Sequence, residues 1–181
     1  LGVHVTDEHS MSDAQKAYVK KYFREQVRPR IFPVMVGRDS VFPPLVDRSA
    51  YLYIVFDKAK ANAGKNRFRC SLIEIPTDTL PRFVLLPEEN GQRYVMILDD
   101  IIRCGLEDIF APFDCVPSGA YSIKIIRDAE LDIEMDLSES IIHKINKSLK
   151  KRKQGCPVRF SHDSELPDNE LAFLLKKMGL R

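Results

Sequence analysis

A strand-like segment that ends in a cluster of charges offers the residues with the clearest chemistry. Between positions 121 and 125, apolar residues alternate with polar ones, which is the period-two pattern of a half-buried strand. Arg127 follows, and then three carboxylates stand two residues apart: Asp128, Glu130 and Asp132. On an extended strand these carboxylates share one face, which would suit Mg²⁺ or a row of arginines. Other hard ligands at a metal-site spacing are missing, so we favour ion pairs with Arg127, at a sheet edge or at a subunit contact.

Histidine and cysteine indicate neither a catalytic centre nor a zinc site. A nucleophile–base arrangement needs histidine beside serine, cysteine or a carboxylate, and none of the histidines has such a local context. No two cysteines form a Cys-x-x-Cys pair, and no histidine completes a zinc-site spacing. We therefore predict no catalytic residue, no metal site, and the buried, reduced thiols of a cytosolic protein. The residues concerned are His4, His9, His143, His162, Cys70, Cys104, Cys115 and Cys156.

Basic residues offer a second chemistry, the binding of phosphate groups. A run between Lys147 and Lys153 stands near the end of a predicted helix, where it either binds phosphates or stabilises the negative end of the helix dipole. Other basic residues near predicted strand ends either converge on one groove or scatter over a solvated surface. Both alternatives stay open, and the net charge of +2 gives no argument for nucleic acid or membrane binding. The strand-end residues are Arg28, Arg30, Arg82, Arg93, Lys124 and Arg159.

The elements that must position these residues indicate an α+β fold. The chain has 181 residues and a hydrophobic content of 44%, which suffices for a single compact domain with a core. Strands and helices interleave irregularly around one hairpin, which predicts a mixed β-sheet with several packed helices. Predicted helices span 13–26, 99–110, 138–153 and 166–180. Predicted strands span 1–6, 31–36, 51–56, 68–75, 94–98, 121–125 and 157–161, with an extended piece over 82–87 and a polar turn over 88–92.

Local signals set several of these boundaries. Ser12 and Gln15 form a capping box at the start of the first helix, and Pro29 ends that helix. Pro33 predicts that the next strand is an edge strand or carries a bulge. Asp168 is the predicted cap of the last helix. The expected apolar face of the first helix consists of Ala14, Tyr18, Val19, Tyr22 and Phe23.

The two ends of the chain and its hydropathy bear on location. No run of about 18 apolar residues exists, and the first residues lack the basic start and apolar core of a signal peptide. We therefore expect a cytoplasmic protein. The chain does not begin with methionine, which indicates a piece cut from something longer.

Four stretches of the sequence form a pattern that is specific in combination, although each is weak alone. They stand at 74–87, 98–110, 120–132 and 157–160. The first stretch contains Glu-Ile-Pro followed by Leu-Pro-Arg-Phe-Val and Leu-Pro, and the second contains Leu-Asp-Asp-Ile-Ile-Arg. The third contains Ala-Tyr-Ser-Ile-Lys followed by Arg-Asp-Ala-Glu-x-Asp, and the fourth is Pro-Val-Arg-Phe. In order and approximate spacing they resemble the middle, or head, domain of bacterial polyphosphate kinase, the long type with a phosphohistidine intermediate. The likeness covers nearly the whole chain, 1–181.

The resemblance implies what the parent enzyme does. Such an enzyme reversibly transfers the terminal phosphate of ATP to inorganic polyphosphate and uses magnesium. The phosphorylated histidine of the family lies in the carboxyl-terminal domains in a His-x-Lys context, which none of the histidines here shares. The resemblance therefore implies a non-catalytic head domain that is inactive alone and binds neither ATP nor magnesium alone. It further implies that the partners are the remaining domains of the same polypeptide and a second subunit, and it implies no nucleic acid.

The family's head domain is also implicated in framing the tunnel for nucleotide and polyphosphate. On the motif stretches, the basic residues suited to an anionic chain are Arg82, Lys124, Arg127 and Arg159. The carboxylates beside Arg127 would repel polyphosphate, which favours an ion-paired structural or dimer role for that cluster. Peripheral membrane association of a parent enzyme would leave no mark in this sequence. The alternative reading is a free-standing module that binds polyanions or other proteins.

Overall fold

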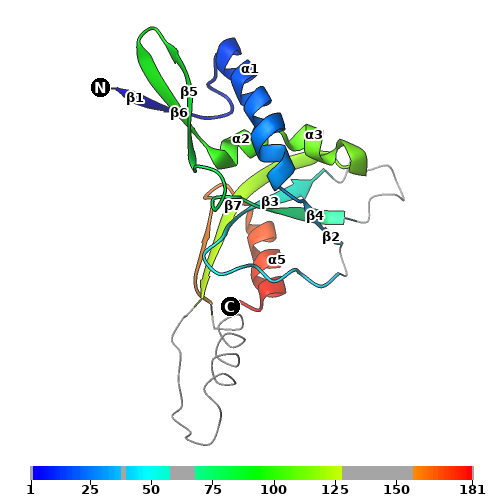
Figure 1. The fold of residues 1–181 in the computed structure, drawn as a ribbon. Coiled ribbons are helices and arrows are strands. Elements are labelled where there is room, and N and C mark those ends of the chain that lie inside the picture. The colour runs from blue at the N-terminus through cyan, green and yellow to red at the C-terminus, as the bar shows by residue number, and fades with distance from the viewer. Residues whose placement is uncertain (1, 38–39, 58–67, 128–156, 181) are drawn as a thin grey trace, which may run out of the picture. The chain divides into compact units, whose positions relative to one another are not determined.

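The computed structural model describes residues 2–37, 40–57, 68–127 and 157–180 (Figure 1). They form two compact units, described separately below. Unit 1 consists of Leu1–Val41 and Tyr51–Ser122, and unit 2 of Phe42–Ala50 and Ile123–Arg181. The predicted α+β class is confirmed, with helices packed beside sheets that contain both parallel and antiparallel pairs. The helix predicted over 138–153 lies outside the described residues. No helix in the described part of the chain is long and apolar enough to cross a membrane.

The first helix begins as predicted and turns a different face to the core. In α1 (Asp13–Tyr22) the Ser12 side chain accepts from the backbone of Gln15, and the Gln15 side chain accepts from the backbone of Ser12, so the capping box is confirmed. The helix continues as a π turn, Phe23–Val27, and a 3₁₀ turn, Arg28–Arg30. The buried positions are four residues apart, whereas Ala14 and Tyr18 of the predicted apolar face are exposed. The buried residues are Gln15, Val19, Phe23 and Val27.

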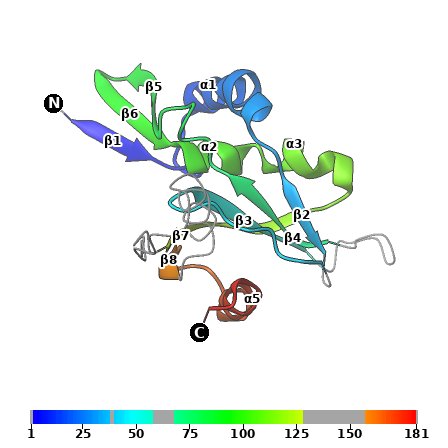
Figure 2. The ribbon, with the colours of Figure 1, turned by 60° about the horizontal axis from the view of Figure 1, so that its bottom comes forward.

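A three-stranded sheet lies beside α1 in unit 1 (Figures 1 and 2). Its order is β1 (Val3–Thr6), β6 (Gln92–Ile97) and β5 (Phe83–Glu89), with β1 parallel and β5 antiparallel to β6. Asn90 and Gly91, with φ of 53° and 74°, close the β5–β6 hairpin. Two successive positive φ angles define a type I′ turn, which suits the twist of a hairpin.

The larger sheet begins in unit 1 with β2 (Val34–Gly37), β4 (Phe68–Glu74) and β3 (Ala50–Phe56) as neighbours in that order. The predicted antiparallel pairing of β3 with β4 is confirmed, and so is the edge position of β2. Side chains along β3 are buried with little interruption, because both faces of this strand are covered. The core sits here and under α1.

A short irregular helical segment connects the sheets, and it corrects the continuous helix predicted over 99–110. The segment is α2 (Leu98–Cys104), then α3 (Leu106–Phe110), then a 3₁₀ turn, Ala111–Phe113. The break is at Gly105, where an added Cβ would overlap the ring of Phe23. The buried aromatic ring thus occupies the space that a side chain at the junction would need.

Strand β7 (Pro117–Arg127) starts in unit 1 and ends in unit 2. It is longer than predicted at both ends. Its second part pairs antiparallel with β8 (Pro157–His162), which confirms the last predicted strand. The final helix, α5 (Asp168–Met178), starts with Pro167 at the N-cap position and no side-chain cap, so Asp168 is not the cap that we predicted. It lies instead in the first turn, where its charge favours the positive helix end.

Candidate functional site

Unit 1 holds a buried polar network that joins helix α2 to strand β7. Asp99 is 1% exposed, and its Oδ2 accepts from Arg82 Nη2 at 3.1 Å and from Ser122 Oγ at 2.9 Å. Burying a carboxylate is costly unless it is paired and hydrogen-bonded, so these two donors make its position tolerable. Asp99 Oδ1 has no hydrogen-bond partner among the described residues.

Arg103 completes the network from the other end of the same helix. Its Nη1 contacts Asp100 Oδ1, its Nη2 donates to Ser122 Oγ at 3.1 Å, and its Nε donates to the carbonyl of Ala120 at 3.1 Å. The Arg103 side chain is only 16% exposed, and its guanidinium contacts a carboxylate, a hydroxyl and a backbone carbonyl at once. Each of the two buried carboxylates, Asp99 and Asp100, thus contacts an arginine.

The pKa of Asp100 is raised to about 6 by burial first and then by the nearby charge of Glu8. Arg103 acts in the opposite direction and does not cancel these effects. The folded state therefore binds a proton at Asp100 more tightly than the unfolded state does. Its contribution to stability is complete below about pH 4 and is lost as the pH rises through about 6.

We expect this carboxyl to impose a pH dependence on the free energy of unfolding. Between pH 4 and pH 7 the loss from Asp100 should be about 2 kcal/mol, because each tenfold change in proton affinity corresponds to roughly 1.4 kcal/mol and the unfolded carboxyl is already partly ionised at pH 4. Asp100→Asn retains an acceptor for Arg103 without the charge, and should flatten the profile. Urea unfolding at pH 4, 5, 6 and 7 measures it. Exposed Asp78→Asn is the matched control, and an unchanged slope in Asp100→Asn would contradict the assignment.

Two of the predicted phosphate-binding residues stand close together in unit 2. In the β7–β8 pairing, Lys124 lies opposite Ser161 and Ile126 lies opposite Arg159. Residues that pair across a ladder share one face, so Lys124 and Arg159 are diagonal neighbours on the same face, about 7–8 Å apart. Ile123 and Ile125 are buried on the other face. The sequence alone could not show that these two cations share one face of the β7–β8 pair.

The remaining candidates are placed separately. Arg82 precedes β5 in unit 1, where it pairs with Asp99 and stays 41% exposed. Arg127 ends β7 in unit 2, and its backbone N–H donates to Asp47 Oδ1 at 2.7 Å. The carboxylates Asp128, Glu130 and Asp132 lie outside the described residues. Their ion pairs with Arg127 stay a prediction.

Two of the thiols, those of Cys104 and Cys115, are weak nucleophiles in this structure. Cys70 and Cys115 are buried as predicted, whereas Cys104 is exposed because it occupies the last turn of α2, at the edge of its buried stripe. Although Cys104 is exposed as a residue, the surrounding protein still removes part of the hydration of its sulfur, and this desolvation, with the charges of Glu8 and Asp100 adding to it, raises the pKa of Cys104 to about 11. Burial also raises the pKa of Cys115. Since the thiolate is the reactive form, neither has the activated character of a catalytic cysteine.

Sequence reasoning missed the network around Asp99, Asp100, Arg103 and Ser122. No partner was assigned to either aspartate from the sequence. A signal was present, because both acids stand directly between apolar residues of a segment that is buried from Leu98 to Ile102. Adjacent carboxylates inside an apolar run need partners, and Arg103 is spaced one turn from Asp100.

The clearest binding chemistry among the described residues is the basic face of β7 and β8. Among the described residues, no group of three or more His, Cys, Asp and Glu side chains is placed to hold a metal ion. The acidic network of unit 1 is matched by its own arginines. The basic face of β7 and β8 presents cations that suit phosphate oxygens.

Comparison with known proteins identifies the family. Residues 14–181 match the family model for the polyphosphate kinase middle domain. The chain is 36% identical to the polyphosphate kinase of Vibrio cholerae serotype O1 over 181 residues, which are 98% of this chain and 25% of that protein. It is 31% identical to the polyphosphate kinase of Escherichia coli strain K12 over 181 residues, 98% of this chain and 26% of the relative.

A solved structure agrees with these relatives. The crystal structure of polyphosphate kinase from Porphyromonas gingivalis matches with a TM-score of 0.74 and 25% identity, over 99% of this chain and 24% of that one. The chain thus spans about a quarter of the length of the relatives that it matches. These matches confirm the resemblance that the four sequence stretches predicted. The chain belongs to the polyphosphate kinase family and corresponds to its middle domain.

Proposed function

We propose that this chain is the middle domain of a longer polyphosphate kinase and serves it as a non-catalytic scaffold. The parent enzyme would transfer the terminal phosphate of ATP reversibly to polyphosphate, with magnesium. The observation that carries the proposal is the family match over residues 14–181, in relatives about four times as long. The described residues offer no grouped metal ligands, so we assign no magnesium-dependent step to them.

The purified 181-residue chain tests the non-catalytic part of this proposal. With ATP, magnesium and a polyphosphate primer it should make no polyphosphate, whereas the full-length enzyme should. The reason is that none of the histidines of this chain stands in the His-x-Lys context of the family's phosphorylated histidine. Measurable synthesis by the isolated chain, free of contaminating enzyme, would refute the scaffold role.

We propose that the domain frames the polyphosphate path with the basic face of β7 and β8. Lys124 and Arg159 are spaced along one face, as a chain of phosphates requires. Arg82 is a second contact in unit 1, because an arginine has five N–H donors and the pair with Asp99 leaves others to bind phosphate. Arg127 is the fourth predicted contact.

Removing either cation of the basic face, Lys124 on β7 or Arg159 on β8, should weaken polyphosphate binding. Lys124→Ala and Arg159→Ala should each cost about 1 kcal/mol, roughly fivefold in Kd, because each removes a charge-assisted contact to phosphate. Fluorescence anisotropy with a labelled polyphosphate at 0.15 M salt measures this. Lys16→Ala on α1 is the matched control, since Lys16 is an exposed cation on another element. Equal losses in the control and in these two variants would contradict the path.

We further propose that the charged segment after β7 supports dimerisation. Arg127 lies at its start, tied by its backbone to Asp47. Arg127→Ala should weaken association of the full-length enzyme more than Lys151→Ala does. If Arg127 forms an ion pair at the subunit contact, its removal leaves the partner carboxylate buried there without a compensating positive charge. Sedimentation velocity across a dilution series compares the two variants. Identical dissociation of both would argue against this role.

A further inference from the structure

The three-stranded sheet of unit 1 has two apolar faces. On the inner face, Val84 pairs with Met96 across the β5–β6 ladder, and Leu86 follows two residues later. These side chains are buried, and β5 contacts α1. A sheet with one face on the core normally turns polar side chains to water on the other. Here the alternation fails.

The opposite face carries a row of apolar side chains, of which the middle one, Val95, is half-buried and the outer ones are exposed. Val5 pairs with Val95, and Val95 pairs with Leu85, so the three stand side by side across β1, β6 and β5. Val3 and Phe83 share this face because they stand two residues from Val5 and Leu85. We call these five residues the outer sheet face. Val5 is 73% exposed, Leu85 66%, Phe83 62% and Val3 56%.

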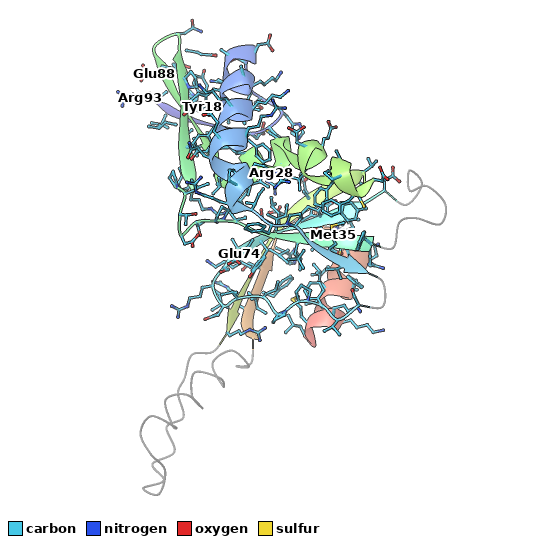
Figure 3. All side chains as sticks on the ribbon, turned by 45° about the vertical axis from the view of Figure 1, so that its right-hand side comes forward. Tyr18, Arg28, Met35, Glu74, Glu88 and Arg93 are labelled. Carbon is cyan, nitrogen blue, oxygen red and sulfur yellow. The ribbon has the colours of Figure 1, made fainter. Side chains whose placement is uncertain are left out.

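A contiguous apolar surface of this kind marks a binding site for another protein segment. It does not suit polyphosphate, because an apolar surface offers no compensation for the lost hydration of a charged chain. Arg93 stands at the hairpin end of this same face, because it pairs with Val3 across β1 and β6, and its charge is compensated by Glu88 at 2.9 Å (Figure 3). Both labelled side chains lie on the β5–β6 hairpin.

The dimensions of this face fit one helix. Three strands at about 4.8 Å spacing present a surface about 10 Å wide, and a helix with its side chains is about 10–12 Å across. A helix on each side of a sheet is a stable layered arrangement, and α1 already supplies one of them. The missing layer is an amphipathic helix with an apolar stripe.

The longer polypeptide is the source that the family relation indicates. Its relatives extend about four times the length of this chain, and β1, the first element here, is an edge strand of this sheet. A helix elsewhere in the same polypeptide would be a tethered partner, and short flexible linkers give effective concentrations in the millimolar range. We propose that an amphipathic helix of the same longer polypeptide packs on the outer sheet face. This inference rests on the proposed function, that the chain is a middle domain.

Thiol labelling measures how accessible the outer sheet face is in the isolated 181-residue chain and in the full-length kinase. Leu85→Cys is placed in a background with Cys104→Ser and Cys156→Ser, so that the new thiol dominates the signal, and its reaction with a maleimide is followed by mass spectrometry. We expect labelling at least tenfold slower in the full-length kinase than in the 181-residue chain, at every protein concentration. Val41→Cys, 93% exposed and also in unit 1, is the matched control and should react equally in both proteins.

Two results would overturn the inference. Equal labelling of Leu85→Cys in both proteins means that no helix covers the face. Protection that disappears on dilution means that a second copy covers it rather than the same polypeptide. Phosphate transfer by the full-length protein is measured on the same samples. An active enzyme without protection refutes only this inference, whereas a protected but inactive protein refutes only the proposed function.

Discussion

Replacing Arg103 with alanine should lower the free energy of unfolding by about 3–5 kcal/mol, the range for breaking a buried ion pair. The change removes the donor to Asp100, Ser122 and the Ala120 carbonyl at once. A buried carboxylate without its arginine then carries its full desolvation cost. Urea unfolding of the 181-residue chain at pH 7 measures the loss, and the loss should shrink at pH 4, where Asp100 takes up a proton.

Arg24→Ala is the matched control for this experiment. Arg24 also belongs to unit 1 and also pairs with an aspartate, Asp108, at 3.3 Å, but its side chain is 58% exposed. Exposed ion pairs contribute about 0–1 kcal/mol, so the control should lose little. If both variants lost the same amount, or if the loss in Arg103→Ala were independent of pH, the network would not have the role assigned to it.

The second large effect is expected at the helix break. Gly105→Ala should cost about 2–3 kcal/mol, near the upper end for overpacking a core, because the new methyl group meets the Phe23 ring. That ring is 2% exposed and has little free space to move into. Thermal unfolding followed by circular dichroism measures the effect. Gly2→Ala, whose added Cβ would meet only His4 Nε2 at 3.5 Å, should be close to neutral.

A double-mutant cycle separates this clash from a general effect of alanine. Phe23→Leu creates room beside Gly105 at its own cost. In the Phe23→Leu background, Gly105→Ala should lower the free energy of unfolding by much less than it does in the unsubstituted chain. The difference is a favourable coupling energy of about 1 kcal/mol or more. Additive losses would show that the ring is not what excludes a side chain at position 105.

Local features of the fold were predictable from the sequence because their causes are local. The capping box needs only Ser12 and Gln15, and the β3–β4 hairpin follows from two apolar runs around a polar connector. The break at Gly105 was not predictable, because its cause is a ring from a distant part of the chain. The same holds for the buried aspartates, whose partners Arg82 and Ser122 come from other elements.

The sequence predicted a chemistry for the candidate site, phosphate binding, but could not predict how the residues are arranged. Basic residues on the motif stretches indicated phosphate binding, but only the ladder register shows that Lys124 and Arg159 share a face. A shift of that register by one residue would turn them to opposite faces. The exposed face of Val5 and Leu85 was hidden for a related reason, since alternation in the sequence does not say which face is covered.

The π turn at Phe23–Val27 has a consequence for length variation in relatives. In an α-helix, residues four apart drift by about 40° per step, so a stripe with a strict spacing of four leaves the core face. The wider π turn rotates each residue less, and Val27 stays buried in line with Phe23. Deleting one residue there would restore an ordinary helix and turn the following Ile31 by about 100°. The π turn thus sets the direction in which Ile31 points as the chain enters β2. We therefore expect that an alignment of relatives would rarely show a single-residue deletion within Phe23–Val27.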